Sequence, residues 1–287
     1  MTALELHSTN LRCALRPDLG GCLAGLWLGD EPVLRSTEPQ DLKAARQSGC
    51  FPLVPFSNRI AQAQLQWHGT SHPLVRNNGD EPHAIHGVGW QRVWQVLEHN
   101  ESSAFLSYEH RADSGWPFAF DASQMIQLHP NRLTLTLSFT NQAHGAAPVG
   151  LGWHPYFVKR AHSQLSFQAS GRWEMGPDKL PTHRTAITGL SADCDTLDVD
   201  HCFDGWHGAL TLRDAVMQVR IESGMSRLVV FTHPTRDTVA IEPVSHVNNA
   251  LHLVRDGAMD AQSLGLAVLP PGESMSATMD IMVEPAR

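Results

Sequence analysis

A strict alternation of apolar and polar residues recurs along this 287-residue chain and limits the folds open to it. Residues 133–139 read Leu-Thr-Leu-Thr-Leu-Ser-Phe, and residues 217–221 and 277–283 alternate in the same way. Successive side chains of a β-strand point to opposite faces, so a period of two is typical of a strand with one face in the core. Residues 104–108 and 228–231 are also rich in residues that favour strands. The pattern predicts an all-β fold.

Turn-forming residues separate these strands and favour an antiparallel arrangement. Gly, Pro and Asn gather between them at residues 78–80, 129–131, 141–145 and 270–272. Short strands with such punctuation are typical of a large antiparallel sandwich or barrel. Helical patterns are scarce, and we expect only a short helix over 40–46 and one helical turn over 245–251. The lack of alternating strands and helices argues against a parallel α/β fold.

Nothing in the sequence divides the chain into parts. It contains no internal repeat, low-complexity tract or linker. A length of about 200–250 residues is ordinary for one large all-β domain. We therefore expect residues 1–287 to form a single domain, as a monomer or a homodimer.

The composition argues against several classes of partner. With 21 basic and 29 acidic residues, the formal net charge is −8, whereas nucleic-acid binders carry a basic patch. The N-terminus lacks the basic and apolar regions of a signal peptide. No apolar run approaches the roughly 20 residues of a membrane span. We expect a soluble, cytoplasmic protein that binds neither nucleic acid nor membrane.

The cysteines predict a reduced environment. Their number is odd and no pair has CxxC spacing, which favours free thiols over disulfides or a metal centre. They are Cys13, Cys22, Cys50, Cys194 and Cys202.

The segment 51–60 places an arginine among apolar residues. Two prolines and the pair Ser57-Asn58 interrupt an apolar run before Arg59. A guanidinium in such surroundings needs acceptors for its five donors. The hydroxyls of a polyol, a ligand carboxylate and a structural Asp or Glu would each supply them. Arg59 is therefore a candidate binding residue and equally a candidate structural residue.

The segment His83-Ala-Ile-His86-Gly-Val-Gly-Trp90 has two histidines three residues apart. Such a pair can ligate a metal ion, but no third ligand follows at a fixed spacing. A loop histidine beside Gly-x-Gly-Trp also suits a ligand pocket or a purely structural role. The local sequence leaves all three interpretations open.

Two further segments carry candidate proton-transfer groups. His154 lies within Gly-Leu-Gly-Trp-His-Pro-Tyr-Phe, where apolar neighbours would lower the pKa of its imidazole. Glu242 ends an apolar run and precedes a proline. On local sequence alone, His154 might as well be bonded to a backbone carbonyl, and Glu242 might as well form a structural salt bridge.

Taken in order, these segments resemble the aldose 1-epimerase (galactose mutarotase) family. The resemblance runs from about Gly20 to Glu273. Its markers are Asn58-Arg59-Ile60, His86-Gly87, His154-Pro-Tyr-Phe157, Asp200-His-Cys-Phe203 and Glu242-Pro243. Each marker is common alone, but five in register over nearly the whole length are specific.

The resemblance implies a fold and a reaction. The family fold is a large antiparallel β supersandwich, which agrees with the strand pattern. The family interconverts the α and β anomers of a free aldose with no cofactor and no metal. The counterpart of Glu242 takes a proton from the C1 hydroxyl, and the counterpart of His154 gives one to the ring oxygen. The counterparts of Arg59, His86 and Asp200, with Asn58 beside them, bind the sugar.

The chain also departs from the galactose-specific members. They carry an Asn-His-Ser-Tyr-Phe type of segment where this chain has Trp153-His-Pro-Tyr-Phe157, and His-Gly-Gly where it has His86-Gly-Val88. These differences leave the sugar open. They leave the proposed acid and base in place. The pocket aspartate also stays open, because Asp198 and Asp204 lie close to Asp200.

Three alternatives to a mutarotase of free aldoses remain. A hexose-6-phosphate 1-epimerase would need extra cations near the pocket, for which Arg92, Lys159 and Arg160 are candidates. A non-catalytic carbohydrate-binding protein would use the same pocket without needing Glu242. A metal-dependent cupin-like enzyme would want a His-x-His pattern that is not evident here.

Overall fold

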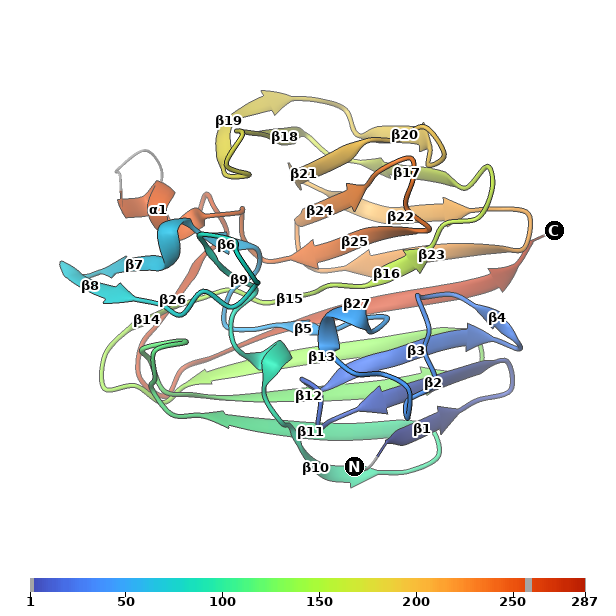
Figure 1. Cartoon of the computed structure of the whole chain (residues 1–287), viewed down its shortest axis with the longest axis horizontal. Coiled ribbons are helices and arrows are strands. Elements are labelled where there is room, and N and C mark those ends of the chain that lie inside the picture. The colour runs from blue at the N-terminus through green and yellow to red at the C-terminus, as the bar shows by residue number, and fades with distance from the viewer. Residues whose placement is uncertain (1–2, 256–259, 287) are drawn as a thin grey trace.

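The computed structural model describes residues 3–255 and 260–286 and consists almost entirely of antiparallel strands (Figure 1). The largest sheet has nine strands in the order β10-β11-β12-β13-β27-β23-β22-β17-β20. Their bounds are β10 Gln95–His99, β11 Ser103–His110, β12 Phe120–His129, β13 Arg132–Asn141, β27 Ser274–Pro285, β23 Met217–Ser223, β22 His207–Arg213, β17 Gln164–Gln168 and β20 Leu190–Asp193.

A second large sheet runs β19-β18-β21-β24-β25-β15-β5, and β16 also pairs with β25. Its strands are β19 Pro181–Ala186, β18 Gly171–Met175, β21 Val199–Asp204, β24 Arg227–Thr232, β25 Thr238–Val244, β15 Gly152–Trp153, β5 Pro52–Leu53 and β16 Tyr156–Val158. It faces one half of the nine-stranded sheet, and Phe167 of β17 meets Phe203 of β21 with ring centres 4.9 Å apart.

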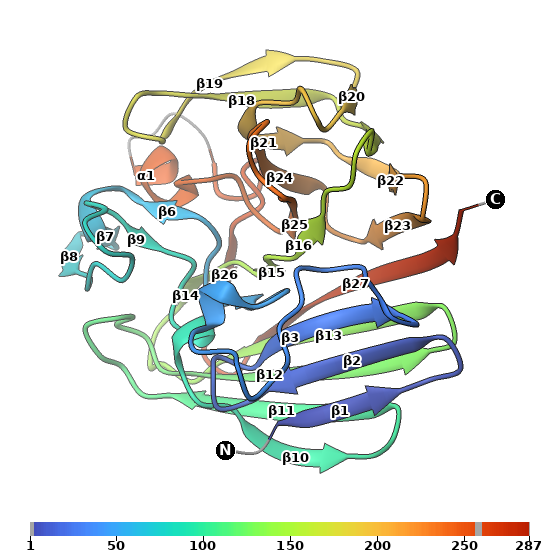
Figure 2. The ribbon, with the colours of Figure 1, turned by 45° about the vertical axis from the view of Figure 1, so that its right-hand side comes forward.

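A four-stranded sheet, in the order β1-β2-β3-β4, lies over the other half of the nine-stranded sheet, where β2 contacts β12 (Figure 2). Its strands are β1 Leu4–His7, β2 Leu11–Arg16, β3 Cys22–Leu28 and β4 Glu31–Pro32. Three two-stranded pairs complete the strands: β6 Arg59–Ile60 with β9 Ala84–Ile85, β7 Gln64–Trp67 with β8 Thr70–Pro73, and β14 Ala147–Val149 with β26 Ala267–Leu269. The expected large antiparallel sandwich is confirmed.

The alternating segments form the strands they predict. In β13, the apolar residues from Leu133 to Phe139 are buried and the intervening Thr and Ser side chains are less so. Its neighbour β27 pairs with it in a register that sets Leu135 beside Met279. One face of each strand therefore contributes to the hydrophobic core between the layers.

The helical predictions are less accurate. Residues 40–46 form a turn and an open stretch, followed by the 3-10 helix η1 Ala45–Gln47, so the expected helix is wrong. The guanidinium of Arg16 binds the carbonyl oxygens of Pro39 and Leu42, which occupies acceptors that a helix there would use for its own backbone.

The predicted turn over 245–251 is displaced. The only α-helix in the described residues is α1 Ala250–Arg255, and the 3-10 helices η2 Ala61–Ala63 and η3 Gly89–Gln91 lie in loops. Residues 245–247 are held in irregular backbone instead, because Ser245 and His246 bond to Leu151 and Ser57 of neighbouring segments. No helix in the described ranges has both the length and the apolar character needed to cross a bilayer.

The five cysteines are buried and unpaired, as predicted. Cys13, Cys22 and Cys50 lie in or beside the four-stranded sheet, and burial raises the pKa of the Cys13 and Cys22 thiols to about 12. Such thiols stay protonated at neutral pH and behave as small apolar side chains.

A glycine fixes the loop that follows β9. Gly87 has a φ of +69°, and a Cβ added there would lie 2.2 Å from the carbonyl oxygen of Val54. Both the left-handed conformation and the contact exclude other residues.

We therefore predict that Gly87→Ala lowers the free energy of unfolding by more than the roughly 1–2 kcal/mol that a positive φ alone costs. The matched control is Gly79→Ala, since Gly79 has a φ of +57° and open space around it. Urea denaturation of both variants checks this. Equal losses would show that the Val54 contact does not constrain the loop.

Candidate active site

The register of the second sheet places His154 directly opposite Glu242. Tyr156 pairs with Ala240, and Gly152 pairs with Val244 on the same strand, β25. In an antiparallel pair each step along one strand is matched by a step back on the other, so position 154 falls beside position 242. The two side chains meet with His154 Nε2 and Glu242 Oε1 3.2 Å apart.

The same face of the sheet forms the floor of a cavity. The next strand, β24, sets Val229 beside Glu242 and Phe231 beside Ala240, and β21 in turn sets Asp200 beside Phe231. Side chains two residues apart share a face, so these rows all point to one side. The cavity has a volume of about 490 Å³, within the range of about 300–1,000 Å³ that is ordinary for small-molecule sites. Its floor is lined by Asp200, Val229, Phe231, Glu242, His154 and Tyr156.

Burial shifts the two central groups in opposite directions. Only 2% of Glu242 and 6% of His154 is exposed. Burial raises the pKa of the Glu242 carboxyl well above its usual range, and the Asp200 carboxylate adds to the rise. Burial also lowers the pKa of His154 well below its usual range, and His86 and Arg35 add to the fall. Their attraction across 3.2 Å opposes both shifts without reversing them.

Each of the two groups has an atom without a partner. Glu242 Oε2 and His154 Nδ1 are buried and make no hydrogen bond within the described residues. An imidazolium at His154 would leave its Nδ1–H unsatisfied, which also disfavours the charged form. Unsatisfied buried acceptors are uncommon in proteins and are found where a ligand binds.

His86 reaches the cavity from the loop after β9. Its backbone has a φ of +62°, a strained conformation for a residue other than glycine. The backbone N–H of Asn58 donates to His86 Nδ1 at 3.1 Å. Burial lowers the pKa of His86 to about 3, so the ring is neutral and its single proton is on Nε2. His86 therefore presents an N–H donor.

This tautomer bears on the metal hypothesis. The ligand atoms of His86, His154 and Glu242 all lie within 4.8 Å of one another. A metal-binding histidine normally donates its second N–H to an acceptor, whereas the second nitrogen of His86 accepts. His83 does not join the group: its Nδ1 accepts from the Gln62 N–H, and its Nε2 lies 3.1 Å from the Asp178 carbonyl oxygen. Its role is structural.

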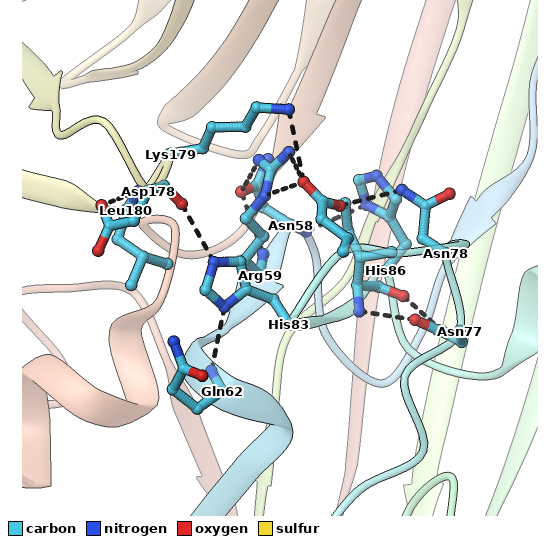
Figure 3. A network of polar contacts seen from close by, with 12 residues as sticks. Asn58, Arg59, Gln62, Asn77, Asn78, His83, His86, Asp178, Lys179 and Leu180 are labelled. Carbon is cyan, nitrogen blue, oxygen red and sulfur yellow. Dashed lines mark hydrogen bonds and ion pairs between the residues drawn. The ribbon is translucent and has the colours of Figure 1, made fainter.

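Arg59 has the structural partner that its sequence context allowed. Its guanidinium donates twice to Glu81 Oε1, at 2.7 and 3.0 Å (Figure 3). Glu81 Oε2 accepts from Asn78, and Lys179 lies 3.6 Å from Glu81. Lys179 belongs to the β18–β19 turn, so this network ties that turn to the opposite wall of the cavity. Both interpretations of Arg59 hold, since it is ion-paired and also lines the cavity.

The remaining predicted residues are also placed. Asn58 lines the cavity wall, and its side-chain oxygen accepts from the Arg59 backbone N–H. Asp200 is the aspartate on the floor. Asp198 is exposed, and Asp204 is ion-paired with two arginines, Arg184 and Arg227.

Sequence reasoning missed several residues of the wall. Glu81 lies in a segment that had only turn character, and no spacing related it to Arg59. Phe231 was recognised only as part of a strand. Lys179 lies in a turn with no recognisable motif, and Tyr156 was a marker of the resemblance with no role. The signal for Tyr156 and Phe231 was their period-two relation to His154 and Val229, which needed the register to be known.

Comparison with known proteins agrees with this geometry. A family model described as aldose 1-epimerase matches residues 2–282. The Escherichia coli K12 protein YphB, described as uncharacterized, is 30% identical over 307 aligned positions, which cover 99% of each chain.

Solved structures share the fold. A putative aldose 1-epimerase from E. coli K12 superposes with a TM-score of 0.88 at 28% identity, covering 99% of both chains. A galactose mutarotase-like protein from Clostridium acetobutylicum gives 0.87 at 18% identity, covering 99% of this chain and 95% of the other. The expected galactose mutarotase-like supersandwich is therefore confirmed.

The network around Glu81 yields a stability prediction. Glu81→Ala leaves the guanidinium of Arg59 buried without a carboxylate, because no other ion pair to Arg59 is present in the described residues. Their side chains are only 9% and 14% exposed, so we expect a loss of about 3 kcal/mol in the free energy of unfolding. The control is Lys179→Met, whose side chain is 59% exposed and should cost about 0.5 kcal/mol or less. Urea midpoints that fall equally in both variants would contradict a structural role for the buried pair.

Proposed function

The chain belongs to the aldose 1-epimerase family, and from this premise we propose that it interconverts the α and β anomers of an unphosphorylated aldose. The observation that carries the proposal is the buried cross-strand pair of His154 and Glu242, 3.2 Å apart on the cavity floor. Ring opening removes a proton from the C1 hydroxyl and adds one to the ring oxygen. Both oxygens are bonded to C1, so the acid and the base must lie close together.

In the proposed reaction, Glu242 takes the proton of the C1 hydroxyl as His154 Nε2 gives a proton to the ring oxygen. The bond between C1 and the ring oxygen breaks, and its electron pair stays on that oxygen. The products are an open-chain aldehyde, a protonated Glu242 and a neutral His154. Rotation about the C1–C2 bond presents the other face of the aldehyde. The reverse proton transfers then close the ring as the opposite anomer and restore both residues.

The burial of the pair supports this use of it. The reactive pair holds one transferable proton, which lies on His154 before ring opening and on Glu242 after it. With that proton the pair has no net charge in either arrangement. A second proton would leave a net positive charge and its loss a net negative one, and burial disfavours both. A buried pair of this kind is therefore kept in the form that the reaction needs.

The other cavity residues supply complementary contacts for a sugar. His86 offers the N–H donor described above, directed at the ring oxygen or a neighbouring hydroxyl. Arg59 and Asn58 offer donors from the wall, and Asp200 offers acceptor oxygens from the floor. Tyr156 and Phe231 provide apolar ring surface, which suits the C–H face of a pyranose.

The charges of the cavity favour a neutral substrate. Its lining cations, Arg59 and Lys179, both pair with Glu81. The basic residues considered for a 6-phosphate are engaged elsewhere: Arg92 with Asp113, Arg160 with Glu31 and Asp214, and Lys159 with backbone carbonyls. None of these three lines the cavity. A phosphate dianion would meet no unpaired cation among the described lining residues.

We predict that His154→Ala and Glu242→Gln each slow anomerisation by about 10²-fold or more, because each removes one proton-transfer partner. Polarimetry of freshly dissolved α-anomers of galactose, glucose and fucose measures the rate above that of buffer. The control is Asp198→Asn, an exposed position outside the cavity, which should leave the rate unchanged.

The same assay separates the alternatives. Acceleration of the 6-phosphates in preference to the free sugars would replace the proposal with a hexose-6-phosphate 1-epimerase. Sugar binding by calorimetry without acceleration of any substrate would indicate a carbohydrate-binding protein. Full activity after treatment with a chelator is expected, since the proposed steps use only protein groups.

We further predict a broad, bell-shaped dependence of kcat/KM on pH. Below the acidic limb both groups are protonated and the base is lost, and above the alkaline limb both are deprotonated and the acid is lost. The lowered pKa of His154 moves the acidic limb down, and the raised pKa of Glu242 moves the alkaline limb up. The plateau should therefore extend below pH 5 and above pH 8. A narrow optimum between the ordinary Glu and His values would contradict the shared-proton account.

A further inference from the structure

A cation stands behind the proposed acid, separated from it by one aromatic ring. The guanidinium carbon of Arg35 lies 3.8 Å from the centre of the Tyr156 ring. The imidazole of His154 is stacked on the same ring, with centres 4.3 Å apart and planes 26° apart. Two flat groups this close to one ring cannot share a face without overlapping. Arg35 and His154 therefore lie on opposite faces of Tyr156.

Main-chain groups hold Arg35 in this position. Its Nε and Nη2 donate to the carbonyl oxygen of Ser48, and Nη2 also donates to that of Arg46. No carboxylate forms an ion pair with Arg35 within residues 3–255 and 260–286, so its charge is not neutralised by direct contact. A fixed guanidinium on the face of an aromatic ring is a favourable cation–π arrangement.

Tyr156 contacts the reactive nitrogen as well as the ring. Its hydroxyl oxygen lies 3.3 Å from His154 Nε2, the same atom that faces Glu242. Burial raises the pKa of the Tyr156 hydroxyl to about 12, so it stays a neutral phenol at working pH. The contact aims Nε2 into the cavity without adding a charge.

We propose that Arg35 and Tyr156 are positioning residues for the acid: the Tyr156 ring fixes the plane of the His154 imidazole, and the Arg35 cation behind it makes the imidazolium a stronger proton donor. This rests on the proposed function. Donation to the ring oxygen removes the positive charge from His154, and a nearby fixed cation favours that removal. The effect is available before the sugar binds, because Arg35 is already in place.

Several other groups bear on the charge of His154. Those that act on the imidazole itself are Glu242, His86, Tyr156, Arg35 and Arg236, the last of which lies over the Phe231 ring. Asp200 and Arg59 act on Glu242 with opposite signs, and the thiol of Cys50 is kept neutral by burial. Arg35 is set apart because it lies on the same stack as the imidazole, so its removal can be tested alone.

The test is the pH dependence of kcat/KM for Arg35→Gln and Arg35→Lys, measured by polarimetry on the sugar that the wild type turns over fastest. Arg35→Gln removes the cation, so both limbs should move to higher pH by about half a pH unit or more. Its kcat on the plateau should fall about threefold or more, because the acid is weaker. Arg35→Lys keeps the charge, and its limbs should stay within about 0.2 pH units of the wild type.

A purely structural role would lower the rate without moving the limbs. Limbs of Arg35→Gln that coincide with the wild type would therefore overturn the proposal for the cation, as would a Lys variant shifted as far as the Gln variant. Circular dichroism and urea midpoints establish that each variant is folded.

The Tyr156 layer has its own test, which holds even if Arg35→Gln does not fold. Tyr156→Leu removes the ring that orients the imidazole, and we expect kcat to fall about tenfold or more with KM changed less than about threefold. Tyr156→Phe keeps the ring and should retain most of that loss. Wild-type kcat in Tyr156→Leu would refute the positioning role. A wild type that does not accelerate any aldose is a different failure, because it would refute the proposed function itself.

Discussion

The pairing of β16 and β15 against β25 is the constraint on which the site depends. It sets His154 across from Glu242, and the register of β24 and β21 then brings Phe231 and Asp200 to the same face. Every residue of β25 is buried, so a glutamate within it is costly unless it has a use. A slip of one residue in this register would turn Glu242 to the other face of the sheet and dissolve the pair.

The backbone also decides what the buried histidines can do. Burial keeps His86 and His246 neutral, with pKa values lowered to about 3 and about 4. The Ser57 N–H donates to His246 Nε2, and the Val247 carbonyl oxygen accepts from Nδ1, so both nitrogens of that ring are used. His86 has only one nitrogen engaged by the backbone, and His154 has neither nitrogen bonded to it. The histidines that face the cavity are thus those with a free nitrogen to offer.

Much of the fold was predictable from sequence because period-two alternation is a local property. The strands at 133–139, 217–221 and 277–283 follow from it directly. The helix expected over 40–46 failed because Arg16, far away in sequence, binds its carbonyl oxygens. Local patterns carry no information about such partners.

The candidate site was predictable in part. Asn58, Arg59, His86, His154, Asp200 and Glu242 all lie on one cavity, which the order of the motifs suggested through a resemblance. The pairing of Arg59 with Glu81 and the stack of Arg35, Tyr156 and His154 were not predictable, because they join segments with no fixed spacing. The choice of Asp200 over its neighbours likewise required the strand register.

Exchange spectroscopy by NMR at anomeric equilibrium is the most direct test that His154 and Glu242 share one proton to open and close a sugar ring. The α and β H1 signals of an aldose are resolved, and no net reaction or cofactor is needed. The account predicts exchange cross-peaks between the two signals when wild-type protein is added, and their absence with Glu242→Gln at equal concentration. Exchange at the buffer rate with wild-type protein for every aldose tried, or undiminished exchange in the variant, would contradict it.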